Sequence, residues 1–300
     1  MSEPSPWPWM KQVQVAIADA IAPVCDDDKR ASVKDLIREH AEKIAKIKAG
    51  ILDHPLYDER KHDDLWILRF YLSHKKSRPA IDAAKRTLDF RKEHKLDETD
   101  IRQTPPHRVA TEGSKIVAFF KFCQDGTIVP THPHPKRGVI LFVRPATMDQ
   151  HRAVKELTED YWLPTFVYLS EWCHQWLDYV TRTTGRLTKS VRFLDTDGMR
   201  PSHINREYLR RNAKAVGAME DFYPQLLEAG FICNPPHIAK LLFNTIKVIL
   251  PKRLKEKIHM IHPKENEQER KRLFQHISEQ DLPEQYGGQN LTPPANWDPM

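Results

Sequence analysis

The sequence lacks the features of membrane-spanning and disulfide-linked proteins. No apolar run approaches the roughly 18 residues that cross a bilayer, and the candidates Ile116 to Phe120 and Val139 to Val143 have the length of strands. The four cysteines are far apart and show no zinc-site or disulfide-scaffold spacing. The first residues also lack the basic-then-apolar layout of a secretory signal, so we expect a reducing compartment.

Common catalytic motifs are missing as well. The chain contains no Gly-rich phosphate loop, no His-Glu-x-x-His, no Gly-x-Ser-x-Gly and no cysteine-phosphatase motif. His132 with His134, and His259 with His262, have no carboxylate or third histidine at ligand spacing, which favours exposed or structural histidines. We therefore predict a protein without a catalytic residue, a metal or a cofactor.

Length and hydrophobic pattern favour one large α/β domain, either alone or with a small companion. Of the 300 residues, 40% are hydrophobic, which is enough for a sizeable core. Short apolar runs bounded by turn residues alternate with helical patterns, and this alternation predicts a mostly parallel sheet with flanking helices. The five expected strands are Ile116 to Phe120, Val139 to Val143, Ser190 to Asp195, Gly230 to Cys233 and Ile258 to Ile261.

Positive charge gathers in one segment. Between Pro236 and Arg272 there are ten Lys and Arg against four acids, an excess equal to the +6 net charge of the whole chain. Beside an apolar helix, such a cluster favours an anionic membrane surface, where each basic side chain contributes about 1 kcal/mol. Beyond Lys264, a solvated helix face with Glu–Lys pairs is the favoured alternative. Nucleic acid is not expected, because no zinc-finger spacing or single-strand-binding signature accompanies the charge.

The segment from Ile238 to Leu250 predicts an unusually apolar helix. Its apolar side chains cover an arc of roughly 220°, against about 100° for an ordinary surface helix. Two interpretations stay open: a helix buried on most sides by protein, or a gate that closes a lipid cavity and meets a bilayer. The basic segment from Lys252 to Lys257 favours the gate, because it adds attraction to anionic lipid.

The order of motifs around this helix resembles that of one family. Tyr223-Pro224 leads into the strand to Cys233, and the apolar helix, the basic segment and Leu282 to Gly288 follow. Upstream stand Asp63-Asp64 and Leu68-Arg69-Phe70. Together these motifs resemble the CRAL-TRIO family of lipid carriers, which includes phosphatidylinositol/phosphatidylcholine transfer proteins and the tocopherol and retinaldehyde carriers.

The resemblance implies a fold and a division of the chain. The implied fold is α/β: the CRAL-TRIO fold, a mostly parallel five-stranded sheet with flanking helices and a gate helix over a lipid cavity, preceded by a small helical region. The implied parts are a proline-rich arm 1–10, a helical region 11–110, a CRAL-TRIO domain 111–289 and a tail 290–300.

The resemblance also implies a binding site. Lys257 matches a headgroup-binding lysine of phosphatidylinositol-binding members, whereas Gln225 and His74 replace their Glu and basic residue. Arg192 stands where phosphatidylcholine-binding members carry Thr, so it either meets an anionic headgroup or points away from the cavity. The implied lipid-binding residues are Lys257, Gln225, His74, Ser190, Arg192, Phe231, Cys233, Leu242, Phe243 and Ile246, and the implied membrane-contact residues are Lys240, Lys247, Lys252, Arg253 and Lys255.

The expected function follows from the resemblance and the apolar helix. We expect the protein to bind a single hydrophobic lipid, of phospholipid or isoprenoid type, in an internal cavity and to transfer or present it at an anionic membrane surface. The alternative is a non-catalytic accessory subunit of a membrane complex, assembled through the two tails. The expected location is cytoplasmic and peripheral to a membrane, or organelle-associated, for example mitochondrial, within a complex.

Replacing both Phe243 and Ile246 by Asp tests the gate. Two charges on the apolar helix oppose its burial over a lipid, so we expect lipid transfer between vesicles to be abolished. Transfer at the unsubstituted rate would contradict the gate assignment.

Overall fold

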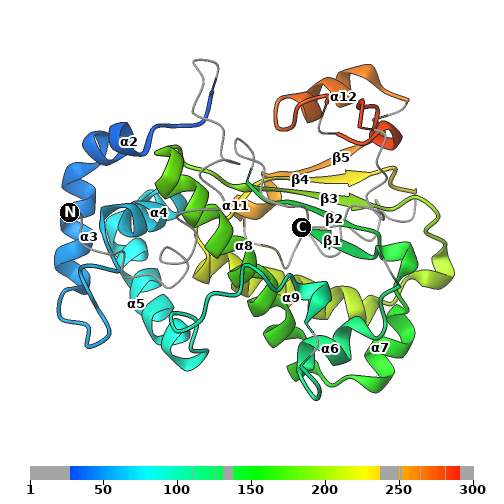
Figure 1. Ribbon diagram of the computed structural model, residues 1–300, viewed down its shortest axis with the longest axis horizontal. Coiled ribbons are helices and arrows are strands. Elements are labelled where there is room, and N and C mark those ends of the chain that lie inside the picture. The colour runs from blue at the N-terminus through cyan, green and yellow to red at the C-terminus, as the bar shows by residue number, and fades with distance from the viewer. Residues whose placement is uncertain are drawn as a thin grey trace.

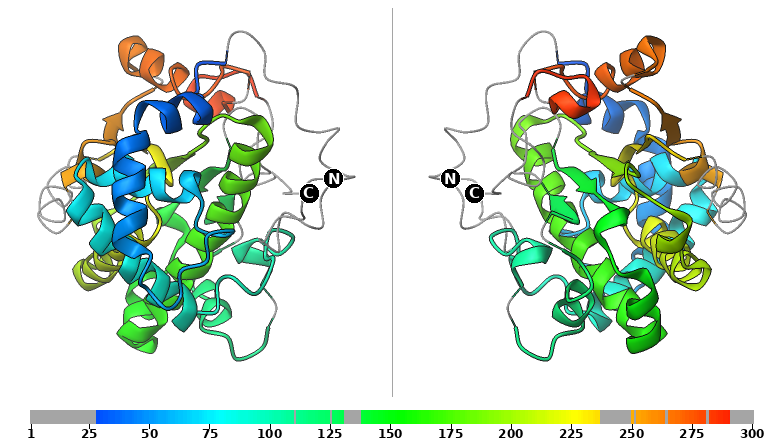
Figure 2. Two further views of the ribbon diagram at one scale, coloured as in Figure 1. Left: turned by 90° about the vertical axis from the view of Figure 1, so that its left-hand side faces the viewer. Right: turned by 90° about the vertical axis from the view of Figure 1, so that its right-hand side faces the viewer.

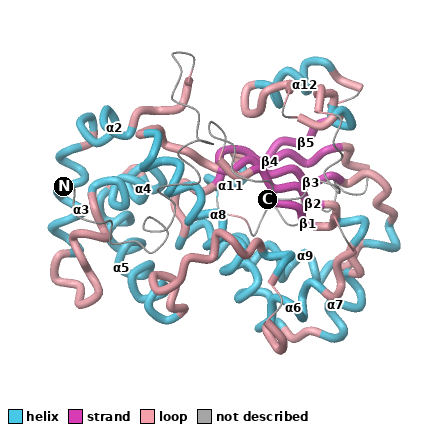
Figure 3. The backbone as a smooth tube through the Cα atoms, viewed as in Figure 1, coloured by secondary structure: helices cyan, strands magenta, loops and turns pink. Residues whose placement is uncertain are grey.

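The helices of the first hundred residues and a sheet lie on opposite sides of the molecule (Figures 1 and 3). The computed structural model describes residues 28–109, 111–124, 126–130, 138–236, 250, 252–263, 265–280 and 282–290. The predicted arm, the apolar helix up to residue 249 and the tail from residue 291 lie outside these ranges. Within them, no helix is long and apolar enough to cross a membrane.

Four helices form the described part of the helical region. They are α2 (Val33–Glu39), α3 (Ala41–Ile51), α4 (Asp64–His74) and α5 (Ser77–Glu93). The pattern from Ala31 to Ile51 predicts one helix, but the chain forms two, because the backbone at His40 leaves the helical conformation with φ −109° and ψ 18°. Asp63 caps α4: its side chain accepts a hydrogen bond of 3.0 Å from the Trp66 N–H.

The sheet runs in the order β1-β2-β3-β4-β5 in the described part of the chain. Its strands are β1 (Ile128–Pro130), β2 (Ile140–Val143), β3 (Ser190–Asp195), β4 (Leu227–Cys233) and β5 (Ile258–Ile261). The pair β1–β2 is antiparallel and the pairs from β2 to β5 are parallel. The predicted α/β fold is therefore confirmed, and β2 to β5 lie where the apolar runs predict them.

The remaining predicted strand is wrong. The run from Ile116 to Phe120 belongs to helix α6 (Lys115–Phe120), and β1 pairs with β2 instead. Ser114 begins this helix, because its Oγ accepts a hydrogen bond of 3.2 Å from the Val117 N–H. An apolar run of five residues fits a strand or a buried helical turn equally well, so the N-cap decides.

Crossover helices connect the parallel strands. The longer elements outside the helical region are α7 (Gln150–Glu156), α8 (Trp162–Thr184), α9 (Arg206–Phe222), α11 (Lys252–Lys255) and α12 (Glu267–Phe274). Short 3-10 turns are η1 (Pro106–Arg108), η2 (Pro145–Thr147), η3 (Glu159–Tyr161), η4 (Pro201–His203) and η5 (Glu284–Tyr286). Helix α8 ends at Gly185, whose φ of 65° is a left-handed conformation that favours glycine.

One face of the sheet is buried except at β5, where His259, the neighbour of Phe231, is half-buried. It lies beneath α12 and η5, which stand at the top of the molecule in Figures 1 and 2. Phe142 and Phe193 stack at 4.9 Å between ring centroids, and the Tyr286 ring stacks on both at 5.8 Å. We call it the covered face; its residues are Ile140, Phe142, Val191, Phe193, Ala229, Phe231, Cys233 and Ile261.

The opposite face of the sheet is buried less, although α8 packs against part of it. Alternation along the strands and the strand register place two rows of neighbours on it: Leu141, Arg192, Gly230 and Ile258, and then Val143, Leu194, Ile232 and Met260. Six of these eight residues are half-buried, whereas the eight residues named for the covered face are all buried. We call it the half-exposed face.

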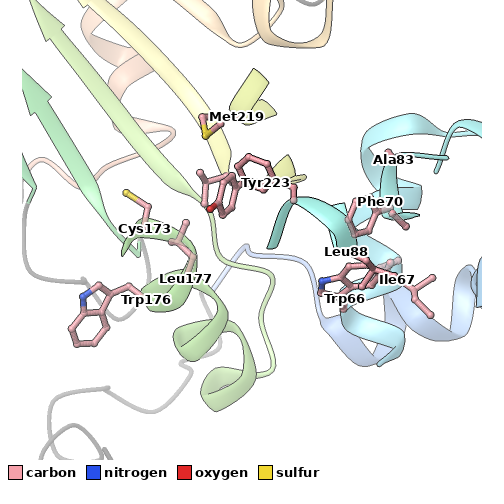
Figure 4. Packing of buried hydrophobic residues seen from close by; sticks show 14 of the residues in the cluster. Trp66, Ile67, Phe70, Ala83, Leu88, Cys173, Trp176, Leu177, Met219 and Tyr223 are labelled. Atoms are coloured by element: carbon pink, nitrogen blue, oxygen red, sulfur yellow. The ribbon is translucent and has the colours of Figure 1, made fainter. Parts of the chain in front are cut away.

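A continuous apolar core joins the helical region to α8 and α9. Figure 4 shows Trp66 and Leu88 of the helical region on one side and Leu177 of α8 on the other. Tyr223, at the end of α9, belongs to the same cluster and is 1% exposed. The core therefore fixes α4 and α5 close to the carboxyl end of α9.

Buried charges join the same elements. Arg91 of α5 donates two hydrogen bonds, of 3.0 and 3.2 Å, to the Glu171 carboxylate of α8. Arg69 of α4 donates one of 3.2 Å to Asp178 of α8. All four residues are at most 3% exposed, so each charge depends on its partner across the interface.

Asp178 is shared between two guanidiniums. Besides Arg69, it accepts a hydrogen bond of 2.8 Å from Arg182, which also contacts Asp63, the N-cap of α4, at 2.6 Å. Burial raises the pKa of the Asp178 carboxyl, but Arg182 and Arg69 outweigh this effect and hold that pKa well below its usual range. The carboxylate is therefore charged in the folded protein, and it stabilises the fold.

The variant Asp178→Asn tests this interface. Removing one partner from a buried ion pair costs about 3–5 kcal/mol, and unfolding in guanidinium chloride at neutral pH measures the loss. The control Asp160→Asn removes an exposed pair with Lys115 and should cost at most about 1 kcal/mol.

The pH dependence gives a second check on the same variant. A carboxyl with a lowered folded pKa stabilises the protein above its unfolded pKa, and this stabilisation is lost as the pH falls. The stability difference between wild type and Asp178→Asn should therefore shrink below about pH 4. Equal stability of the two proteins at neutral pH would contradict the role of Asp178.

Candidate functional site

A charged cluster lies where α4 and α9 end and β4 and β5 begin. We call it the charged cluster and define it by His74, Glu220, Asp221, Arg253 and Lys257. Helix α4 supplies His74, α9 supplies Glu220 and Asp221, and the short helix α11 and the turn after it supply Arg253 and Lys257. The structure thus brings together three residues that the sequence analysis proposed: His74, Arg253 and Lys257.

Arg253 holds the cluster together. Its Nη2 donates to Asp221 Oδ1 at 2.6 Å and to the Glu220 carbonyl oxygen at 2.8 Å. Its Nε lies 3.3 Å from Glu220 Oε1, an ionic contact without hydrogen-bond alignment. Its Nη1 lies 3.4 Å from Nε2 of His74. Burial and the charge of Arg253 lower the pKa of His74, so the imidazole is neutral near pH 7.

Lys257 lies on the other side of Glu220. Its Nζ donates a hydrogen bond of 2.7 Å to the Leu227 carbonyl oxygen and lies 3.7 Å from Glu220 Oε1. Burial lowers the pKa of the Lys257 ammonium, and the Glu220 carboxylate partly opposes this shift. The lysine is therefore anchored to the start of β4.

Gln225 and Ser190 are also bound within the protein. Gln225 has a φ of 63° in the turn after α9, and its Nε2 donates to Ser73 Oγ at 3.0 Å, beside His74. Ser190 is fully buried, and its Oγ donates to the Leu226 carbonyl oxygen at 2.9 Å. The hydroxyl and the amide thus fix the turn between α9 and β4.

Arg192 differs from its neighbours because its guanidinium has no partner among the described residues. It stands on the half-exposed face between Leu141 and Gly230, and its buried Nε makes no hydrogen bond there. A small cavity of about 20 Å³, room for one water molecule, borders it; the lining residues are Arg192, Val216, Met219, Glu220, Tyr223, Leu226, Leu227 and Leu254.

An apolar row follows Arg192 along the sheet. Leu194, Ile232 and Met260 are neighbours in register on β3, β4 and β5. None of them belongs to a hydrophobic cluster of the described residues. This row lies two residues beyond the Arg192 row, which is about 7 Å along a strand.

The structure places several of the expected lipid-binding and membrane-contact residues away from the half-exposed face. Phe231 and Cys233 lie on the covered face, packed beneath α12 and η5, so they do not line the same space as Arg192. The sequence analysis placed them with the lipid because an apolar strand does not show which of its faces meets the ligand. Lys252 is exposed and Lys255 half-buried.

Arg253 is not the free membrane-contact cation that the sequence analysis expected, because it is bound to Asp221 and Glu220. Lys240, Leu242, Phe243, Ile246 and Lys247 lie outside the described residues. Leu250, the last residue of the predicted apolar helix, is 7% exposed and packs with Ala213, Leu227 and Leu254. The chain therefore returns from that segment next to the charged cluster.

Sequence reasoning missed Glu220 and Asp221. It counted the cations after Pro236 and did not consider the acids on the preceding helix. Carboxylates in the last turn of a helix oppose the helix dipole, so the Glu-Asp pair one residue before Tyr223-Pro224 indicates cationic partners nearby. The position of this acidic pair at the end of a helix was the sequence signal that could have identified Glu220 and Asp221.

One hollow of the described part is lined by several charged side chains. A cleft of about 680 Å³ between α2, α4 and α8 is lined by Asp63, Asp64 and Arg182, among others, and two of these charges already pair with each other. No group of three or more His, Cys, Asp or Glu suited to a metal occurs in the ranges that the structure describes.

Comparison with known proteins agrees with this geometry. Residues 124–288, more than half of the chain, match the CRAL/TRIO domain, so the protein belongs to the CRAL/TRIO family, as the motifs predict. The fold is similar to the crystal structure of Sfh5, with a TM-score of 0.55 and 14% identity over 92% of this chain and 95% of that one. Domains of this family bind and transfer lipids, generally without catalysis.

Thiol labelling tests the placement of Cys233. With Cys25 and Cys123 replaced by Ser, Cys173 and Cys233 remain, and both are fully buried. Burial raises the pKa of Cys173 to about 11 against the charge of Arg192, and burial and Asp195 raise the pKa of Cys233. At pH 8, DTNB should label neither thiol before unfolding and both afterwards. Rapid labelling of folded Cys233 would contradict its burial on the covered face.

Proposed function

We propose that the protein binds one lipid on the half-exposed face of its sheet and transfers or presents it at membranes. The lipid chain lies along Leu194, Ile232 and Met260, and its polar end lies toward Arg192 and the charged cluster. The protein acts without a catalytic residue, metal or cofactor, and the lipid is its ligand.

The contrast between the two faces of the sheet carries this proposal. Both faces are rich in apolar side chains, yet one is sealed by α12 and η5 and the other is half-buried. Leu194 and Met260 keep exposed surface and join none of the described clusters. A face of this kind gains stability when an apolar ligand covers it, because each buried CH₂ contributes about 0.8 kcal/mol.

The arrangement of polar groups supports the orientation of the lipid. Arg192, Lys257 and Arg253 gather toward the beginning of β3 to β5, and the apolar row lies further along the same strands. An amphipathic ligand matches such a gradient better than a wholly apolar one, since its polar end would otherwise be desolvated without partners.

Membrane contact is the second part of the proposal. Lys252 is exposed at the start of α11, close to the point where the chain returns from the predicted gate helix. An exposed lysine beside an apolar segment favours an anionic bilayer surface. Arg253, by contrast, is bound to Asp221 and Glu220 and contributes to the fold of the site.

The variant Met260→Trp tests the position of the lipid. The larger side chain fills the space above the apolar row, and displacing about two CH₂ groups costs roughly 1.6 kcal/mol. We therefore expect uptake of a phosphatidylcholine with a fluorescent parinaroyl chain, offered in vesicles, to weaken by about tenfold or more.

The matched control is Leu52→Trp, because Leu52 is 63% exposed in the helical region. It should leave uptake unchanged. Equal uptake by the two variants would contradict the lipid position, and failure of the wild-type protein to take up any lipid would contradict the function itself.

A further inference from the structure

The guanidinium of Arg192 is a charge without a counterion among the described residues. It stands in the middle of a sheet, flanked by Leu141 and Gly230, and neither neighbour offers an anion. Its Nε is shielded from water and makes no hydrogen bond. A partly buried guanidinium in this state is costly unless an anionic group meets it.

The nearest carboxylate does not fill this role. Glu220 borders the same small cavity as Arg192, but its carboxylate already lies between Arg253, at 3.3 Å, and Lys257, at 3.7 Å. Asp221 is bound to Arg253 as well. The cations Arg192, Arg253 and Lys257 therefore lie near two carboxylates, those of Glu220 and Asp221. The two carboxylates already contact Arg253 and Lys257, so the positive charge left over is that of Arg192.

Open space among the described residues exists at Gly230, the neighbour of Arg192 on β4. Gly230 carries no side chain, and among the described residues a Cβ at that position would meet within 4 Å only the Ile258 Cγ1 atom, at 3.8 Å. Gly230 has no left-handed backbone to explain the glycine. The absent side chain leaves room on the half-exposed face at β4, one strand from Arg192.

We infer that Arg192 binds the acidic group of the lipid, a phosphate or a carboxylate, in the space beside Gly230. A guanidinium offers two parallel N–H donors to either oxyanion, which gives both affinity and orientation. From this anchor the acyl chain runs over Leu194, Ile232 and Met260, about 7 Å further along the strands. The inference rests on the proposed function and makes Arg192 the residue that selects acidic over neutral lipids.

Two pairs of lipids with identical chains test the selection. The first pair is oleate and oleyl alcohol, and the second is dioleoyl phosphatidate and dioleoylglycerol, each delivered from cyclodextrin in radiolabelled form to the full-length protein. Wild-type protein should prefer the acidic member of at least one pair by about tenfold or more, as expected of a charge-assisted hydrogen bond.

Three variants separate charge from fold. Arg192→Met should remove the preference while keeping affinity for the neutral lipid within about threefold, since it keeps a long apolar side chain. Arg192→Lys should keep a weaker preference, because it retains the charge without the paired donors. Gly230→Leu keeps the charge but fills the space beside it, and should lower acidic binding even if Arg192→Met fails to fold.

The outcomes separate the role of Arg192 from the proposed lipid-binding function. Preference in the oleate pair alone assigns a carboxylate ligand, and preference in the phosphatidate pair alone assigns a phosphate. Equal binding of both members of each pair, a preference that persists in Arg192→Met, or unchanged acidic binding in Gly230→Leu overturns the role of Arg192 and leaves the proposed function standing. No binding of any of the four lipids overturns the proposed function instead.

Discussion

The buried ion pairs between α8 and the helical region fix the positions of the helices that supply the charged cluster. Arg69 and Arg91 are buried on α4 and α5, and Asp178 and Glu171 of α8 neutralise them. A buried charge without its partner costs several kcal/mol, so the helices are stable against the sheet in this docked arrangement. That docking brings the end of α4, with His74, to Arg253 of α11. The candidate site thus depends on ion pairs that none of its own residues makes.

The site combines a charged end and an apolar row on one sheet face. The charged cluster fixes the beginning of β4 and β5 through Lys257, whose Nζ bonds to the Leu227 carbonyl oxygen. Aromatic stacking fixes α12 and η5 over the covered face, and the proposed ligand site lies on the other face. Arg192 is a cation on that face that no described residue neutralises, and its buried Nε makes no hydrogen bond. Rigid elements therefore hold the proposed anchor, and the proposed path of the lipid chain follows the apolar row beyond it.

Much of the fold could be predicted from the sequence, and the errors have physical causes. Strands β2 to β5 were predictable because turn residues flank each apolar run. The apolar run of α6 was predicted as a strand, because hydrophobic period and length do not distinguish a strand from a short helix. His74 and Lys257 lie in one charged cluster, and Gln225 binds Ser73 beside it. Phe231 was expected at the lipid, and the structure places it on the covered face, because alternation shows that a strand has two faces and not which of them is covered. Glu220 was missed because its partners lie more than thirty residues later in the sequence.

The central claim is that a lipid chain lies on the half-exposed face, and photolabelling tests it most directly. Protein loaded with a fatty acid or phospholipid that carries a diazirine in its acyl chain is irradiated, digested and mapped by mass spectrometry. The account predicts labels on Leu194, Ile232 or Met260, which excess unlabelled lipid removes. Labels on Phe231 or Phe193 of the covered face, or no labelling that competes with lipid, would contradict it.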